Sequence, residues 1–176
     1  MLPTMFTPRL RAARTGLLWL SLLALVLLTG CDDKIGDSCQ YNVDCSAQGD
    51  RLCDLSSPGG YCTIENCTAA ACPDEAQCIA FYPVEFLTKP CFPETEDDPD
   101  PAVGTNDCTP DETCISSGFC ASRASARRYC MLECSKDSDC RDEYECRRTG
   151  LNGAEWVAPL ESDNPDQIKR FCAPKG

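Results

Sequence analysis

Cysteine is the residue type that carries most of the chemistry in this chain. There are 17 cysteines among 176 residues, and there is no histidine. Histidine is the usual zinc ligand and the usual general base, and no C-x-x-C spacing occurs that would suggest a zinc or redox site. Paired cysteines in an oxidising compartment are therefore favoured over thiolate ligands. We expect disulfides, no metal site, no cofactor and no catalytic residues.

An odd number of cysteines leaves one unpaired within a single molecule, and Cys31 is the candidate. It follows a basic stretch, residues 1–15, and an apolar run, residues 16–28. This run is shorter than the roughly 20 residues that span a bilayer, which is typical of a secretory signal peptide. The run ends in the sequence LTGC, residues 28–31. These residues resemble the lipobox of bacterial lipoproteins, since all four positions fit.

The lipobox resemblance implies a location as well as a modification. It implies cleavage before Cys31 and palmitate-type acyl chains on the new terminal residue, which anchor the chain in a membrane of the bacterial cell envelope. Outer membrane or cell surface is the location we favour. Asp32 and Asp33 follow this cysteine directly, and an acid in that position resembles an inner-membrane retention signal. The periplasmic face of the inner membrane is therefore the alternative location.

The other cysteines form two sets of eight around an acidic, proline-rich stretch. Their numbers are Cys39, Cys45, Cys53, Cys62, Cys67, Cys72, Cys78 and Cys91, then Cys108, Cys114, Cys120, Cys130, Cys134, Cys140, Cys146 and Cys172. Six of the seven gaps between consecutive cysteines agree within two residues between the sets. This agreement indicates a tandem duplication.

Each set divides again into two units of four cysteines. The four units cover residues 39–62, 67–91, 108–130 and 134–172. Three connectivities are open in each unit, and spacing does not choose among them. We favour interleaved pairing, first to third and second to fourth, because the short gaps then close compact loops. An aromatic residue precedes the last cysteine in three units, at Tyr61, Tyr129 and Phe171, and an aspartate precedes the second cysteine at Asp44 and Asp139.

The expected fold class is therefore small and disulfide-rich, with tandem repeats, short β ribbons and a signal-peptide helix in front. The expected organisation is a signal peptide (1–30), a lipidated tether (31–38), a first eight-cysteine module (39–91), a linker (92–107) and a second eight-cysteine module (108–176). The pattern resembles cysteine-rich lipoproteins of myxobacteria and their relatives, most closely in "CSKDSDCRDEYEC".

Residues 79–87 are the best strand candidate, with Pro83 as an interruption. Ribbons are expected near Tyr61 and Tyr129, and a helical turn or two within residues 121–129.

Charge excludes one class of partner. Three of the 16 basic residues and none of the 28 acids lie in residues 1–30, so residues 31–176 carry a net charge of −15. Such a surface repels nucleic acid.

The acids of residues 94–107 could bind Ca²⁺, but prolines interrupt the alternation of carboxylates that a calcium loop needs, and a solvated linker is favoured.

Two groups of residues are candidates for binding. Trp156 lies in the long insertion before Cys172, where it either anchors a partner or folds back over the disulfides, and the second is favoured. Arg123, Arg127 and Arg128 form a basic cluster that either binds a carboxylate-bearing glycan or partner or, as we favour, pairs with the protein's own acids. The sequence thus predicts a non-catalytic envelope lipoprotein that binds a protein or polysaccharide. The alternative is a disulfide-rich peptidase inhibitor or antagonist.

Overall fold

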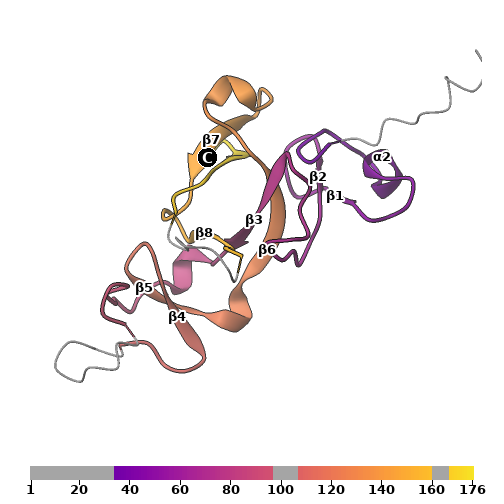
Figure 1. The fold of residues 1–176 in the computed structure, drawn as a ribbon. Coiled ribbons are helices and arrows are strands. Elements are labelled where there is room, and N and C mark those ends of the chain that lie inside the picture. Colours follow the sequence, from indigo (N-terminus) through magenta and orange to yellow (C-terminus); the bar gives the residue numbers. More distant parts are fainter. Residues whose placement is uncertain (1–33, 97–106, 160–166) are drawn as a thin grey trace, which may run out of the picture. The chain divides into compact units, whose positions relative to one another are not determined.

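The computed structural model describes residues 34–96, 107–159 and 167–176 (Figure 1). The expected signal-peptide helix, the anchor residue Cys31 and most of the acidic linker lie outside these ranges. In the described ranges, no helix has the length and apolar character needed to cross a membrane.

Short antiparallel strands make up most of the regular structure. They are β1 (Leu52–Asp54), β2 (Tyr61–Thr63), β3 (Ala76–Phe81), β4 (Glu112–Ile115), β5 (Phe119–Ser122), β6 (Arg127–Leu132), β7 (Tyr144–Arg148), β8 (Ala154–Trp156) and β9 (Arg170–Pro174). The helical pieces are α2 (Asn42–Cys45) and the 3₁₀ turns η1 (Val84–Phe86), η2 (Arg123–Ser125) and η3 (Asp137–Asp139). The prediction of a small disulfide-rich fold built from short ribbons is confirmed.

Three two-stranded ribbons surround one three-stranded sheet. The ribbons are β1–β2, β4–β5 and β7–β9, and the sheet has the order β6–β3–β8 (Figure 1). The strand expected over residues 79–87 ends earlier, at Phe81, because Pro83 has no N–H to continue the ladder and begins the turn into η1. Strands containing Tyr61 and Tyr129 are present as expected. The helical turn expected over residues 121–129 is reduced to η2, between β5 and β6.

All sixteen cysteines outside Cys31 form disulfides within the chain. The pairs are Cys39–Cys53, Cys45–Cys62, Cys67–Cys78, Cys72–Cys130, Cys91–Cys114, Cys108–Cys120, Cys134–Cys146 and Cys140–Cys172. Units 39–62 and 134–172 have the interleaved pairing that we favoured. In units 67–91 and 108–130 the second-to-fourth pairing is wrong, because Cys72 bonds Cys130 and Cys91 bonds Cys114.

A different grouping restores one arrangement throughout the eight bridges. We call four cysteines with first-to-third and second-to-fourth bonds a two-bridge unit. The N-terminal unit is Cys39, Cys45, Cys53 and Cys62; the discontinuous unit is Cys67, Cys72, Cys78 and Cys130; the nested unit is Cys91, Cys108, Cys114 and Cys120; the C-terminal unit is Cys134, Cys140, Cys146 and Cys172. The nested unit lies entirely within the sequence between Cys78 and Cys130.

Strand register gives the four units a shared geometry. In each unit the third and fourth cysteines face each other across an antiparallel pair. The facing pairs are Cys53 with Cys62, Cys78 with Cys130, Cys114 with Cys120 and Cys146 with Cys172. Each ribbon is therefore fixed by two bridges to the loop that precedes it, which lets strands of only three to six residues persist.

The main core gathers aromatic residues from several of these units. Tyr61 of β2, Ile79 of β3, Tyr144 of β7 and Phe171 of β9 are almost completely buried in one cluster. Ile35, the second described residue, is buried in the same cluster. The nested unit contributes no buried residue to it. The fold thus consists of a shared core plus a nested ribbon outside that core.

Candidate functional site

The sequence between β7 and β9 shapes two hollows with a mixed apolar and charged lining. β7 ends at Arg148, and the chain turns through residues 149–153 into β8. Gly153 has a positive φ of 70°, and a Cβ there would come within 2.2 Å of the Tyr82 carbonyl oxygen, so this position requires glycine. The close approach lets the Tyr82 N–H donate to the Gly153 carbonyl, which fixes the turn against the end of β3.

Two adjacent hollows lie beside this turn, and both are lined by Arg148 and Leu151. We call them together the Leu151 groove. The first has a volume of about 410 Å³, with Phe81, Phe171 and Ala154 among its apolar lining residues. The second, about 270 Å³, lies next to Trp156 and Ile168. The groove combines apolar side chains with two guanidiniums, Arg147 and Arg148, and with the carboxylates of Asp137, Glu145 and Glu155. Arg148 lines both hollows, where it can meet an anionic group of a ligand that also has an apolar face.

Trp156 is half-buried and packs mainly against the protein itself. It pairs with Ile79 across β8 and β3 and packs against the main core. The Lys169 ammonium lies 4.5 Å from the centre of its ring, a cation–π contact. The remaining exposed part lines the second hollow of the groove. Trp156 is therefore first a packing residue and only at one edge a residue available to a ligand.

The charge around the groove is divided between paired and unpaired groups. Arg147 and Glu145 form an ion pair at 2.6 Å, which occupies the charge of both. Arg148, the next residue, is exposed and belongs to neither of the two ion pairs found within the described ranges. Of the two arginines that line the groove, Arg148 is therefore the one better placed to bind an anionic group.

The arginines expected to cluster do not share one surface. Arg123 is exposed on η2, where it lines a hollow with Glu96 and Glu112. Arg127 and Arg128 are exposed neighbours in β6 and line a different hollow, together with Glu65 and Tyr129. The pairing with the protein's own acids that we favoured is not seen, since the two ion pairs within the described ranges are Lys89–Glu112 and Glu145–Arg147.

Acidic residues near the expected linker have a structural role. The Glu96 carboxylate accepts hydrogen bonds from the backbone N–H groups of Asp107 and Cys108, at 3.0 and 2.8 Å. It thereby fixes the entry to the nested unit. Residues 97–106 lie outside the described ranges, so the choice of a solvated linker over a Ca²⁺ site stays a prediction. Cysteine groups with metal-like spacing in the described ranges all consist of disulfide-bonded sulfurs, which have no thiolate to offer.

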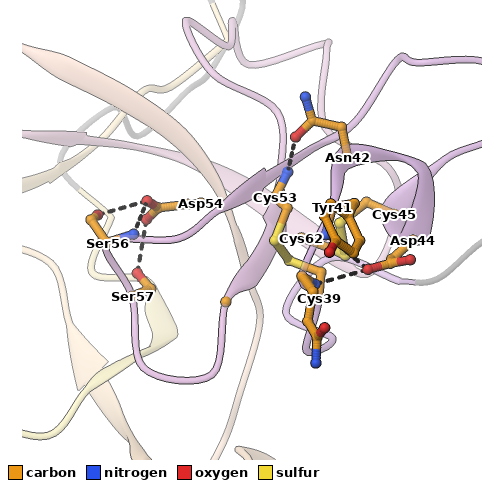
Figure 2. Close-up of a disulfide and its surroundings, with 12 residues drawn as sticks. Cys39, Tyr41, Asn42, Asp44, Cys45, Cys53, Asp54, Ser56, Ser57 and Cys62 are labelled. Carbon is orange, nitrogen blue, oxygen red and sulfur yellow. Dashed lines mark hydrogen bonds between the residues drawn. A yellow bond between two sulfur atoms is a disulfide. The ribbon is translucent and has the colours of Figure 1, made fainter.

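Asp44 and Asp139, noted for their position before a cysteine, have matching structural roles. Figure 2 shows Asp44 beside the Cys39–Cys53 disulfide, where its Oδ2 accepts from the backbone N–H groups of Gln40 and Tyr41. Asp139 accepts in the same way from Ser135 and Lys136. These backbone donors hold the pKa of each carboxyl below its ordinary value. The Gln40 N–H has the largest effect on Asp44, and the Ser135 N–H has the largest effect on Asp139.

A second contact shared by the same two units, to the backbone N–H of the third cysteine, was not predicted from the sequence. The Asn42 side-chain oxygen accepts from the Cys53 N–H at 2.9 Å (Figure 2), and the Asp137 carboxylate accepts from the Cys146 N–H at 2.9 Å. Asn42 and Asp137 each lie three residues before the second cysteine of their unit. That shared position was the signal in the sequence, and it links the loop to the third cysteine in both units.

Comparison with known proteins leaves the chain without a relative to assign it to. No protein-family model matches it, and no similar protein is found among curated proteins or among solved structures.

Proposed function

We propose that the chain is a membrane-anchored, non-catalytic lipoprotein of a bacterial cell envelope that binds a protein or glycan partner through the Leu151 groove. The observation that carries the proposal is the division of the cysteines: sixteen are used in eight bridges, and Cys31, at the end of the apolar run, is the one left over. A stapled scaffold holds surface loops in one conformation and so lowers the entropy cost of binding.

The arrangement of the two-bridge units supports a repeated module as the origin of the scaffold. With the regrouped cysteines, an aromatic residue precedes the fourth cysteine of every unit: Tyr61, Tyr129, Phe119 and Phe171. The matching loop contacts of Asp44 and Asp139 add a second shared feature. We infer four diverged copies of one module, one of them inserted into another.

Mass spectrometry of the native protein tests the anchor. The expected result is a mature chain that begins at Cys31 and carries acyl chains, together with sixteen cysteines that do not react with alkylating reagents before reduction. The Cys31→Ser variant should lack the acyl chains and leave the membrane fraction while retaining all eight bridges. An unmodified Cys31 in the membrane-bound protein would refute the anchor.

Binding assays with groove variants test the ligand site. We expect Leu151→Asp and Arg148→Glu each to reduce binding of the soluble chain to its envelope ligand at least tenfold. Leu55→Asp is the matched control, since Leu55 is also exposed but lies on the β1–β2 turn, away from the groove residues. Equal binding by all three variants would exclude the groove as the site. The probes are purified envelope polysaccharides and membrane-extracted envelope proteins in separate assays.

The peptidase-inhibitor alternative has one structural feature in its favour. Val84 and Phe86 are exposed on η1, in a segment held at both ends by the bridged cysteines Cys78 and Cys91. Inhibitor loops present apolar side chains from a segment fixed in this way. Stoichiometric inhibition in a protease panel, abolished by Phe86→Ala, would favour this alternative over the envelope-binding module.

A further inference from the structure

The folded part of the chain begins very close to the proposed lipid anchor. Ile35 is fully buried, and the Gly36 N–H donates to the Cys62 carbonyl at 2.9 Å. A Cβ on Gly36 would lie 3.0 Å from the Leu132 Cβ, so the backbone is held tightly against β6 here. Lys34 takes part in a turn with Asp37, through N–H to carboxylate and N–H to carbonyl bonds of 2.7 and 3.1 Å. Residues 34–38 of the segment expected as a tether are therefore folded.

The remaining free length sets a limit on distance from the bilayer. Two residues, Asp32 and Asp33, lie between Cys31 and Lys34, and an extended chain spans at most about 3.6 Å per step, so the three steps cover about 11 Å or less. A lipid on Cys31 would therefore hold Lys34, at the start of the folded part, close to the headgroups. This step rests on the proposed anchor.

The exposed apolar side chains nearest in sequence to that anchor are Tyr41 and Val43, both on or beside α2. They are 69% and 73% exposed. Aromatic residues such as tyrosine favour the interface between headgroups and acyl chains, where the ring is buried and the hydroxyl is hydrated. An apolar pair at this depth adds to the free energy of membrane attachment.

Acids outnumber bases in this segment, with Asp32, Asp33, Asp37 and Asp44 against Lys34, so the contact requires a zwitterionic rather than an anionic lipid surface. Asp37 accepts a hydrogen bond from the Lys34 N–H, and Asp44 accepts from Gln40 and Tyr41. Both carboxylates thus already have backbone donors on the protein side. Lys34 adds a positive charge at the end nearest Cys31.

We propose that the α2 surface, formed by Tyr41 and Val43, lies on the phospholipid bilayer and docks the folded chain directly against the membrane. The partner is a lipid surface, chosen because the short connection keeps Lys34, the first described residue, within about 11 Å of an acylated Cys31. The consequence is that any ligand of the Leu151 groove must itself be present close to the membrane surface.

Fluorescence quenching by brominated phosphatidylcholine tests the contact. Trp156 is the single tryptophan after residue 30, so a Trp156→Phe background removes intrinsic signal. In that background, the acylated Tyr41→Trp protein should be quenched several-fold more by brominated vesicles than the acylated Phe86→Trp protein. Phe86 is the matched control because its exposure, 70%, equals that of Tyr41. Equal quenching of the two would overturn the proposal.

Hydrogen exchange on the acylated chain without any tryptophan substitution gives an independent readout. On phosphatidylcholine vesicles, residues 38–45 should exchange more slowly than in soluble Cys31→Ser protein, and residues 82–92 should be unchanged. Inserting a Gly/Ser spacer of about 20 residues before Lys34, with a mean reach of roughly 25 Å, should reduce this protection. Unprotected residues 38–45 in a chain whose acylation is proven by mass would overturn the bilayer contact alone. Absence of acyl chains would overturn the anchor and this contact together.

Discussion

Cys78 and Cys130 face each other across the antiparallel strands β3 and β6, although the whole nested unit lies between them in the sequence. No disulfide joins these two cysteines, because Cys78 is bonded to Cys67 and Cys130 is bonded to Cys72. The strand pair and its two bridges therefore close a unit around an insertion, in the same geometry that continuous units reach without one.

The nested arrangement predicts a specific disulfide map. Proteolysis of the unreduced protein should release peptides that link Cys72 to Cys130 and Cys91 to Cys114. The links from Cys72 to Cys91 and from Cys114 to Cys130 should be absent. Mass spectrometry of the digest decides between the two maps, because they contain the same four cysteines in different peptides.

Removal of either crossing bridge should be costly. Cys72→Ala with Cys130→Ala, or Cys91→Ala with Cys114→Ala, opens loops with sequence separations of 58 and 23, and we expect each pair to lose about 3–4 kcal/mol of unfolding free energy. Because Cys91 and Cys114 lie outside the main core, their removal should leave the near-ultraviolet circular dichroism of the core aromatics largely unchanged. Denaturant titration followed by both signals measures the difference.

Gly60 should tolerate no side chain. It has a φ of 69°, and a Cβ there would lie 2.1 Å from the Cys39 carbonyl oxygen, so Gly60→Ala should destabilise the N-terminal unit by several kcal/mol or prevent correct bridging. Gly49→Ala is the control for the backbone conformation alone, since Gly49 has a φ of 79° with open space around it. It should cost about 1 kcal/mol. Similar losses of thermal stability in the two variants would show that the close contact has no effect.

Arg141 joins the N-terminal and C-terminal units and should not be replaceable by lysine. Its guanidinium lies 4.3 Å from the ring centre of Tyr144 and donates to the Pro58 carbonyl at 2.8 Å and to the Gly60 carbonyl. Tyr61 and Tyr144 stack beside it with ring centres 5.4 Å apart. Lysine keeps the charge but loses the planar donor set, so Arg141→Lys should lower the unfolding free energy by about 1–3 kcal/mol. Arg148→Lys, in an exposed position, should change it little in the same denaturant titration.

Asp44 and Asp139 should make stability depend on pH in the acid range. Their pKa values are lower in the folded chain than in the unfolded one, because backbone N–H donors favour the ionised carboxylates. The stabilisation is then fully present above the unfolded pKa and is lost as the pH falls through the folded pKa. We expect the melting temperature of the Asp44→Asn, Asp139→Asn double variant to fall less than that of the parent when the pH is lowered from about 5 to about 2. This range brackets the ordinary aspartate pKa of about 3.9.

Asp74→Asn controls for the loss of a carboxylate as such, since Asp74 is exposed and its replacement removes one charge, as each of the two substitutions in the double variant does. An Asp74→Asn variant that flattens the acid profile as much as the double variant would show that the loop contacts of Asp44 and Asp139 are irrelevant to it.

Several features of the fold could be predicted because they depend on residues close together in the chain. The interleaved pairing in residues 39–62 and 134–172 follows from short gaps that close small loops. The strands containing Tyr61 and Tyr129 follow from aromatic residues beside cysteines, although the strand of Tyr129 belongs to the three-stranded sheet and not to a two-stranded ribbon. The Leu151 groove could not be predicted, since its lining comes from β3, β7, β8 and β9 together. Trp156 drew attention in the sequence, but Leu151 and Arg148, which line both hollows, did not.

The sequence by itself determined the chemistry of the cysteines: their number, the absence of histidine and the position of Cys31 after the apolar run favour bridges and single out one residue. Only the tertiary structure decided which unit Cys91 and Cys130 belong to. A disulfide requires Cα atoms about 4.4–6.8 Å apart, and order along the chain carries no such distance. The register of β3 against β6 brings Cys130 opposite Cys78 and so within reach of Cys72, with a Cα separation of 5.5 Å, while the nested unit closes on its own cysteines.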